Sequence, residues 1–121
     1  MEVDREEIQQ MADEIHESQE ILTALGDHMR LHLILVMLHD GDSNGMRVGS
    51  IAEKARISRP AVSHHLQILK RAGIMKVRRE GTKNYYYIDA NMEVFDHLIK
   101  MLLHAKKIMM MMPDRSGDEF M

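Results

Sequence analysis

The fold of this 121-residue chain is decided by the stretch Ser58-Arg59-Pro60-Ala61-Val62-Ser63-His64-His65-Leu66-Gln67-Ile68-Leu69-Lys70-Arg71-Ala72-Gly73. Ser58 is a favourable N-cap and Gly73 a favourable residue after the C-cap, so we expect a helix over 59–72. At 100° per residue this helix has two faces. Its apolar face collects Ala61, Val62, His65, Leu66, Ile68, Leu69 and Ala72. Its polar face collects Arg59, Pro60, Ser63, His64, Gln67, Lys70 and Arg71.

The polar face has the composition of a surface that binds nucleic acid. Its side chains can donate to base edges or phosphates, and there is no carboxylate from Arg59 to Gly73 that would repel phosphate. The two adjacent histidines separate in this projection. His64 can reach a groove, whereas His65 lies on the apolar face, where we predict a structural histidine that is hydrogen-bonded to the backbone or to a neighbouring helix.

The flanking segments complete a winged helix. A short helix over 48–54 precedes the stretch, and only residues 56–58 separate the two, which is the spacing of a helix-turn-helix over 48–73. After it, two β-prone runs are joined by Glu80-Gly81-Thr82-Lys83, which predicts a hairpin over 75–88. Arg78, Arg79 and Lys83 surround its turn and are placed to hold phosphates or enter the minor groove.

The two ends of the chain predict a dimer. An apolar stripe over 4–25 begins at the N-cap Asp4, with Glu7 at the capping-box position, and an apolar helix at 28–39 follows as the central core helix. A last helix over 92–112 is apolar around more than half its circumference, so it needs a second covering surface. We therefore predict a homodimer through 4–25 and 92–112, with a frayed polar tail at 113–121. The predicted fold class is mainly α with a small β-hairpin, one winged helix-turn-helix domain over 1–121.

Composition narrows the function. The net charge of −3 conceals a basic segment, because residues 47–83 hold ten basic and two acidic groups. The absence of cysteine excludes disulfides, thiolate metal sites and a cysteine nucleophile. An acidic N-terminus and the lack of an apolar run of about 20 residues predict a cytoplasmic protein without a membrane partner. No ligand triad, nucleophile elbow or phosphate loop is present, so we expect neither an enzyme nor a bound cofactor.

These residues resemble the ArsR/SmtB family of winged-helix transcriptional repressors over about 22–105. The resemblance rests on Ala24-Leu25-Gly26-Asp27, Val48-Gly49-Ser50-Ile51-Ala52, the run from Ser58 to Leu66, Leu69-Lys70-Arg71-Ala72-Gly73-Ile74, Arg79-Glu80-Gly81 and Tyr86-Tyr87. It implies a dimeric repressor on an inverted-repeat operator in double-stranded DNA, with half-sites about 34–36 Å apart or at a multiple. By the same resemblance, Arg59, Pro60, Ser63, His64 and Gln67 read the groove, and Arg78, Arg79 and Lys83 form the wing.

The sequence does not identify the inducer, which could be a metal ion or a small molecule. The family's cysteine sites are impossible here, and its zinc positions correspond to Asn91, Glu93, His104 and Lys107, of which a lysine is a poor ligand at pH 7. The remaining candidates for a metal site shared across the dimer are His97, His104 and Glu93. Thirteen methionines suggest core filler or pocket lining before a soft-metal site. The alternative to a repressor is a winged-helix module for protein–protein assembly.

Overall fold

The computed structural model of the chain describes residues 4–41, 44–89, 91–113 and 117. Over these ranges it consists of helices and one two-stranded antiparallel sheet, which confirms the predicted fold class. The elements are α1 (Arg5–Glu17), α2 (Gln19–Leu25), α3 (His28–Asp40), α4 (Val48–Ala55), α5 (Arg59–Arg71), β1 (Met75–Glu80), β2 (Lys83–Ile88) and α6 (Met92–Met110). Most of the predicted tail, 113–121, lies outside the described residues.

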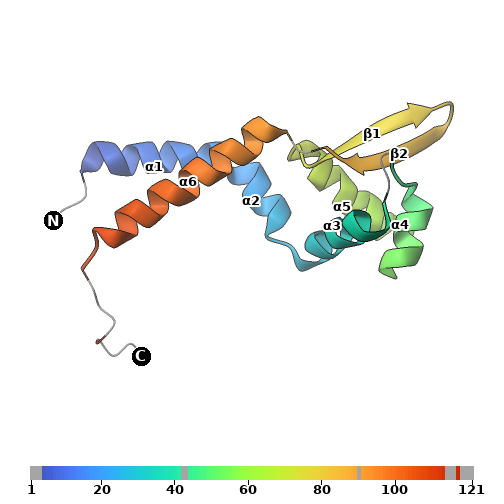
Figure 1. Cartoon of the computed structure of the whole chain (residues 1–121), viewed down its shortest axis with the longest axis horizontal. Coiled ribbons are helices and arrows are strands. Elements are labelled where there is room, and N and C mark those ends of the chain that lie inside the picture. Colours follow the sequence, from blue (N-terminus) through green and yellow to red (C-terminus); the bar gives the residue numbers. More distant parts are fainter. Residues whose placement is uncertain (1–3, 42–43, 90, 114–116, 118–121) are drawn as a thin grey trace.

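The molecule is elongated, with two structurally distinct ends (Figure 1). Helices α2 to α5 and the hairpin form a body at one end. Helices α1 and α6 lie side by side and extend away from it, and we call this pair the helical arm.

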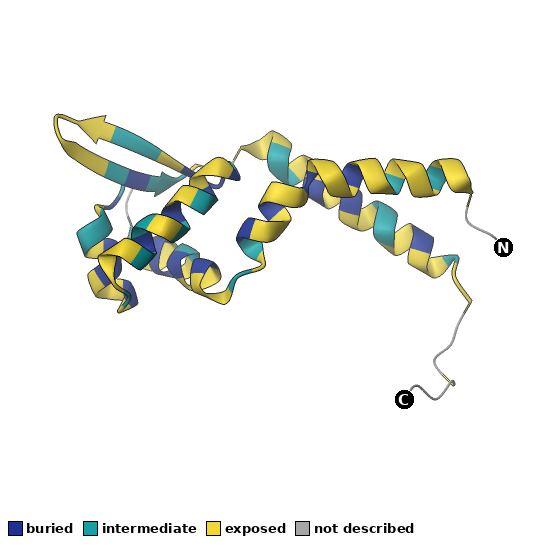
Figure 2. Cartoon of the chain, turned by 180° about the vertical axis from the view of Figure 1, so that it is seen from behind, coloured by how far each residue is buried: buried dark blue, intermediate teal, exposed yellow. Residues whose placement is uncertain are grey.

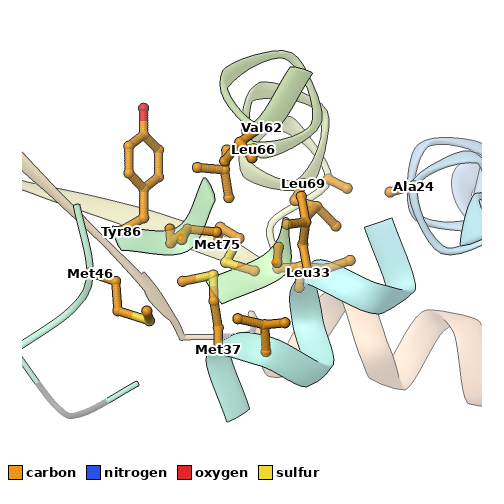
Figure 3. Close-up of a cluster of buried hydrophobic side chains, with 14 of the residues drawn as sticks. Ala24, Leu33, Met37, Met46, Val62, Leu66, Leu69, Met75 and Tyr86 are labelled. Atoms are coloured by element: carbon orange, nitrogen blue, oxygen red, sulfur yellow. The ribbon is translucent and has the colours of Figure 1, made fainter. Parts of the chain in front are cut away.

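The core of the body lies where α3, α4 and α5 meet the hairpin. Val62, Leu66 and Leu69 of α5 are completely buried and face Leu33 of α3 and Met75 of β1 (Figure 3). These are the apolar-face residues expected of α5, spaced three and four apart so that one side of the helix is withdrawn from water. Burial of this face leaves the polar face of α5 at the surface.

Helix α3 contributes to the core as predicted, but only one of its faces is buried although it is apolar around most of its circumference. Leu33, Val36 and Met37 are buried, but Leu31, Leu35 and Leu38 are 44%, 63% and 64% exposed. The elements that contact α3 are α2, α4, α5 and β2, and they leave the face with Leu31, Leu35 and Leu38 uncovered.

The hairpin confirms the predicted wing and extends each strand by one residue. Glu80 pairs with Lys83, which leaves a two-residue turn of Gly81 and Thr82. Gly81 takes the left-handed φ of 60° that a tight hairpin turn requires and that glycine adopts without strain. A bridge between Met46 and Tyr86 ties the base of the hairpin to the segment before α4.

The single helix predicted over 4–25 is divided at Ser18 into α1 and α2. The Ser18 backbone departs from helical geometry, and its N–H donates to the carbonyls of Glu14 and Ile15. The break has a packing cause: α1 runs along α6, whereas α2 packs on α3 and α5. Asp4 caps α1 as predicted, by accepting from the Glu6 N–H, but Glu7 contacts His104 of α6.

The helical arm is covered on one side only (Figure 2). In α6, Leu98, Met101 and Ile108 are buried, whereas Ile99, Leu102, Leu103, Met109 and Met110 are between 53% and 76% exposed. This is the uncovered second face that the apolar circumference of the last helix predicts. No single helix in the described ranges is long and apolar enough to cross a membrane, and the pair α2 and α3 meets that test only with a bend of 80°.

Candidate nucleic-acid interface

The helix-turn-helix is closed by local hydrogen bonds. Ser58 caps α5, with its hydroxyl accepting from the Ala61 N–H at 3.4 Å, and Pro60 occupies the first turn, where no backbone donor is needed. The turn passes through Arg56 in the left-handed conformation at φ 59°. Ile57 then donates its N–H to the Ala52 carbonyl at 3.1 Å, which fixes the direction in which α5 leaves α4.

The predicted polar face of α5 is accessible over most of its length. Ser63 is half-buried, and the exposed members of this face are Arg59, Pro60, His64, Gln67, Lys70 and Arg71. Gln67 lies with its amide nitrogen 3.5 Å from the Tyr86 hydroxyl of the wing. The helix therefore presents a row of donors, and no carboxylate of its own, to the outside.

The half-buried His65 of α5 is structural, as predicted. His65 Nδ1 lies 3.2 Å from a guanidinium nitrogen of Arg30. Arg30 is itself only 7% exposed and donates to the carbonyls of Ala24 and Thr23 at 2.8 and 2.9 Å. The charged head of Arg30 thus ties the end of α2 to the middle of α5, which the sequence pattern alone did not indicate.

The three wing cations differ in their surroundings. Arg78 is partly exposed but already has partners in the protein: its guanidinium donates to the Asn44 carbonyl at 2.8 Å, pairs with Glu80 at 2.8 Å and lies 4.7 Å from the centre of the Tyr85 ring. Arg79 donates to the Gly81 carbonyl at 3.0 Å and remains exposed, as does Lys83. Arg79 and Lys83 are therefore the wing cations most open to a phosphate, and Arg78 stabilises the wing.

A polar groove of about 560 Å³ connects the helix-turn-helix with the wing. Arg59 and Ser63 enter it from α5, and Thr82 and Asn84 from the hairpin. Its other lining residues include Arg47, Gly49, Ser50 and Glu53 of the α4 region. Sequence reasoning missed Arg47, Thr82 and Asn84. The sequence did offer one indication for Arg47. It lies just before the first helix of the motif, so its charge and the N-terminus of that helix would attract the same phosphate.

The metal candidates have carboxylate neighbours that do not converge. His104 has Glu14 2.8 Å from Nδ1 and Glu7 3.3 Å from Nε2, and His97 has Glu17 3.2 Å from Nδ1 and Glu93 3.8 Å from Nε2. In each case the two carboxylates lie at opposite nitrogens of one ring, whereas metal ligands must point to a common centre. Within the described ranges, no group of three or more histidine or acidic side chains is arranged to hold a metal ion.

Comparison with known proteins decides the family. The bacterial regulatory proteins of the arsR family match at residues 32–77, which span α3 to the start of the wing. An uncharacterized HTH-type transcriptional regulator of Methanocaldococcus jannaschii, MJ1325, is 45% identical over 69 residues, covering 57% of this chain and 74% of the relative. The chain belongs to the ArsR family. The transcriptional repressor SdpR of Bacillus subtilis is 41% identical over 69 residues, covering 57% and 72%.

Solved structures share this fold. Reduced HlyU from Vibrio cholerae superposes with a TM-score of 0.57 at 30% identity, covering 81% of this chain and 96% of that one. The homodimeric winged helix-turn-helix DNA-binding domain of Mb0332 from Mycobacterium bovis gives 0.51 at 25% identity, covering 88% and 90%. This ArsR-family protein is a DNA-binding transcriptional regulator with the fold of a family of regulators, not of enzymes.

Proposed function

We propose that this ArsR-family protein is a homodimeric repressor of an inverted-repeat operator, with α5 in the major groove and the hairpin beside it. The observation that carries the proposal is the shared groove. Residues of α5 and of the wing tip line one polar surface, so a single duplex can contact both. SdpR, whose name describes a repressor, supports the direction of regulation.

The residues divide into those expected to read bases and those expected to hold phosphates. Arg59, Ser63, His64 and Gln67 lie on the exposed or groove-facing side of α5, and an arginine donates two hydrogen bonds to guanine. Lys70 and Arg71 at the end of α5, and Arg79 and Lys83 on the wing, are expected to hold phosphates. Because Arg78 is engaged by Asn44 and Glu80, we assign it an indirect part in DNA binding.

Fluorescence anisotropy on an operator selected from a random DNA pool tests this division. Arg59→Ala is expected to lower operator affinity by about tenfold and leave random DNA little affected, since a good bidentate pair is worth about 1–3 kcal/mol. Lys83→Ala is expected to weaken both DNAs alike and to reduce the salt slope by about one. DNA affinity that is weak and indifferent to Arg59→Ala would replace this proposal with a protein-assembly module.

The exposed face of the helical arm supports the homodimer. Ile99, Leu102 and Leu103 are more than half exposed on a helix whose other side is already buried, and burial of such side chains stabilises association by roughly 25 cal/mol per Å² of apolar surface. The Mb0332 domain, which shares this fold, is homodimeric, and this supports the same assembly here. Sedimentation equilibrium is expected to give about twice the chain mass of 14.1 kDa.

A charge-matched pair of variants tests where the dimer forms. Leu103→Glu is expected to shift the protein toward monomer, because it buries a carboxylate in the interface. Lys100→Gln changes the net charge by the same amount at an exposed position of α6 that lies to the side of this face, and it is expected to leave the dimer intact. A wild-type monomer at micromolar concentration, or equal behaviour of the two variants, would contradict dimerisation through this face.

The inducer is addressed by the same DNA assay. Titration with Zn(II), Ni(II) and Cu(I) distinguishes a metal-responsive repressor using His97, His104 and Glu93 across the dimer from one that answers to a small molecule. At both histidines the carboxylates lie at opposite ring nitrogens and do not form a common metal site. We therefore expect the protein to stay bound to the operator in the presence of each of the three metals.

A further inference from the structure

The start of α4 lies directly beneath the charged head of Arg59. A methyl group at position 49 would sit 2.8 Å from Nη2 of Arg59, 3.1 Å from Cζ and 3.4 Å from Nε. These distances are below or at the limit of van der Waals contact for the whole guanidinium. The Arg59 guanidinium therefore occupies the space that a side chain at position 49 would fill.

The backbone does not account for a glycine at this position. The described glycines with a left-handed φ are Gly45, Gly73 and Gly81, and Gly49 is not among them. It lies within the first turn of α4, where alanine forms a helix more readily. Because the atom closest to the hypothetical methyl is the flexible end of a side chain, alanine here would displace Arg59 and leave the α4 backbone in place.

We infer that Gly49 is a positioning residue for DNA recognition: it lets the Arg59 guanidinium lie against α4, at the orientation from which the polar groove is read. Arginine recognises guanine through two parallel N–H donors, so its orientation determines which base edge it can meet. Both residues line the same groove, together with Ser63 of α5 and with Thr82 and Asn84 of the hairpin. This inference rests on the proposed role of Arg59 as a base-reading residue.

Gly49→Ala in the full chain separates this role from a structural one. We expect an unchanged or higher melting temperature, because the helix gains a better former. We also expect operator affinity to fall by about three- to tenfold, part of the loss expected for Arg59→Ala, with affinity for random DNA unchanged. Gly117→Ala is the matched control, since a methyl group there meets nothing within 4 Å.

A double-mutant cycle shows whether Gly49 acts through Arg59. If it does, Gly49→Ala has no further effect on operator affinity in the Arg59→Ala protein. The inference is overturned if Gly49→Ala binds the operator as tightly as the wild type, or if its loss is the same with and without Arg59. Failure of the proposed function would look different, because Arg59→Ala itself would then leave operator preference unchanged.

Discussion

Arg30 is expected to be the side chain whose truncation costs the body of the protein most. The last carbonyls of a helix have no partner within the helix, and at the end of α2 the guanidinium of Arg30 supplies donors to Ala24 and Thr23 at 2.8 and 2.9 Å. A third contact reaches His65 of α5 at 3.2 Å. The same side chain therefore satisfies helix α2 and joins it to the DNA-binding helix.

Arg30→Ala leaves the buried Ala24 carbonyl and the part-buried Thr23 carbonyl without their donors. A buried acceptor without a donor costs about 1–3 kcal/mol, and water can replace part of the loss at Thr23, so we expect the free energy of unfolding to fall by roughly 1–4 kcal/mol. Against the roughly 5–15 kcal/mol typical of a domain, that loss is severe. Arg30→Lys keeps the charge but cannot direct separate donors to both carbonyls and to His65, so we expect it to recover only part of the loss.

Urea unfolding at one fixed protein concentration measures the effect, because dimerisation would otherwise contribute to the apparent stability. Arg5→Ala is the control, as Arg5 is an exposed arginine of α1 and should change stability by no more than about 0.5 kcal/mol. A loss for Arg30→Ala as small as that of the control would refute the assignment of Arg30 as a buried hydrogen-bond donor.

Three further variants probe the cap of α3, the arm and the wing. The backbone N–H of Arg30 lowers the pKa of Asp27, and the Arg30 charge and the Met29 N–H contribute to the shift. Because the ionised carboxylate is favoured in the folded protein, the cap stabilises the fold above about pH 4, and this stabilisation is lost in more acid solution. Asp27→Asn should accordingly be less stable at pH 7, with a difference from wild type in thermal melts that disappears near pH 2. His104→Ala should destabilise the protein by roughly 3 kcal/mol in urea, because it leaves the buried Glu14 carboxylate without its partner, and a neutral result would contradict this pairing. Arg78→Ala should speed amide exchange across 75–88, and unchanged protection would show that its bond to Asn44 does not hold the wing.

Sequence reasoning succeeded where the deciding interactions are local. The caps at Asp4 and Ser58, the two faces of α5 and the glycine of the hairpin turn each depend on residues within a few positions of one another. Helical and strand periodicity then determine which side chains turn inward. The winged helix-turn-helix was predictable for this reason, as was the structural part played by His65.

The errors and omissions share one cause, which is contact between distant segments. The apolar stripe of 4–25 carries no mark of the bend at Ser18, which follows from α1 packing on α6 and α2 packing on α3 and α5. Glu7 fits a capping box locally, yet it pairs with His104 and Lys107 of the last helix. Arg78 belongs to a basic hairpin by composition, and its contacts with the distant Asn44 carbonyl and with the Tyr85 ring follow only from the tertiary fold.

Short-range spacing, caps and charge specify the class of this protein, because they produce a basic helix-turn-helix and wing wherever they occur. The use of individual side chains depends instead on the packing of distant segments. A guanidinium is long and flexible, so its partners depend on which elements the fold brings within reach. Arg30 is buried against α2, Arg78 is held by a loop, and Arg59 lies over the bare backbone of Gly49. Three arginines of one chain thus differ in environment only because of where the helices and the hairpin place them.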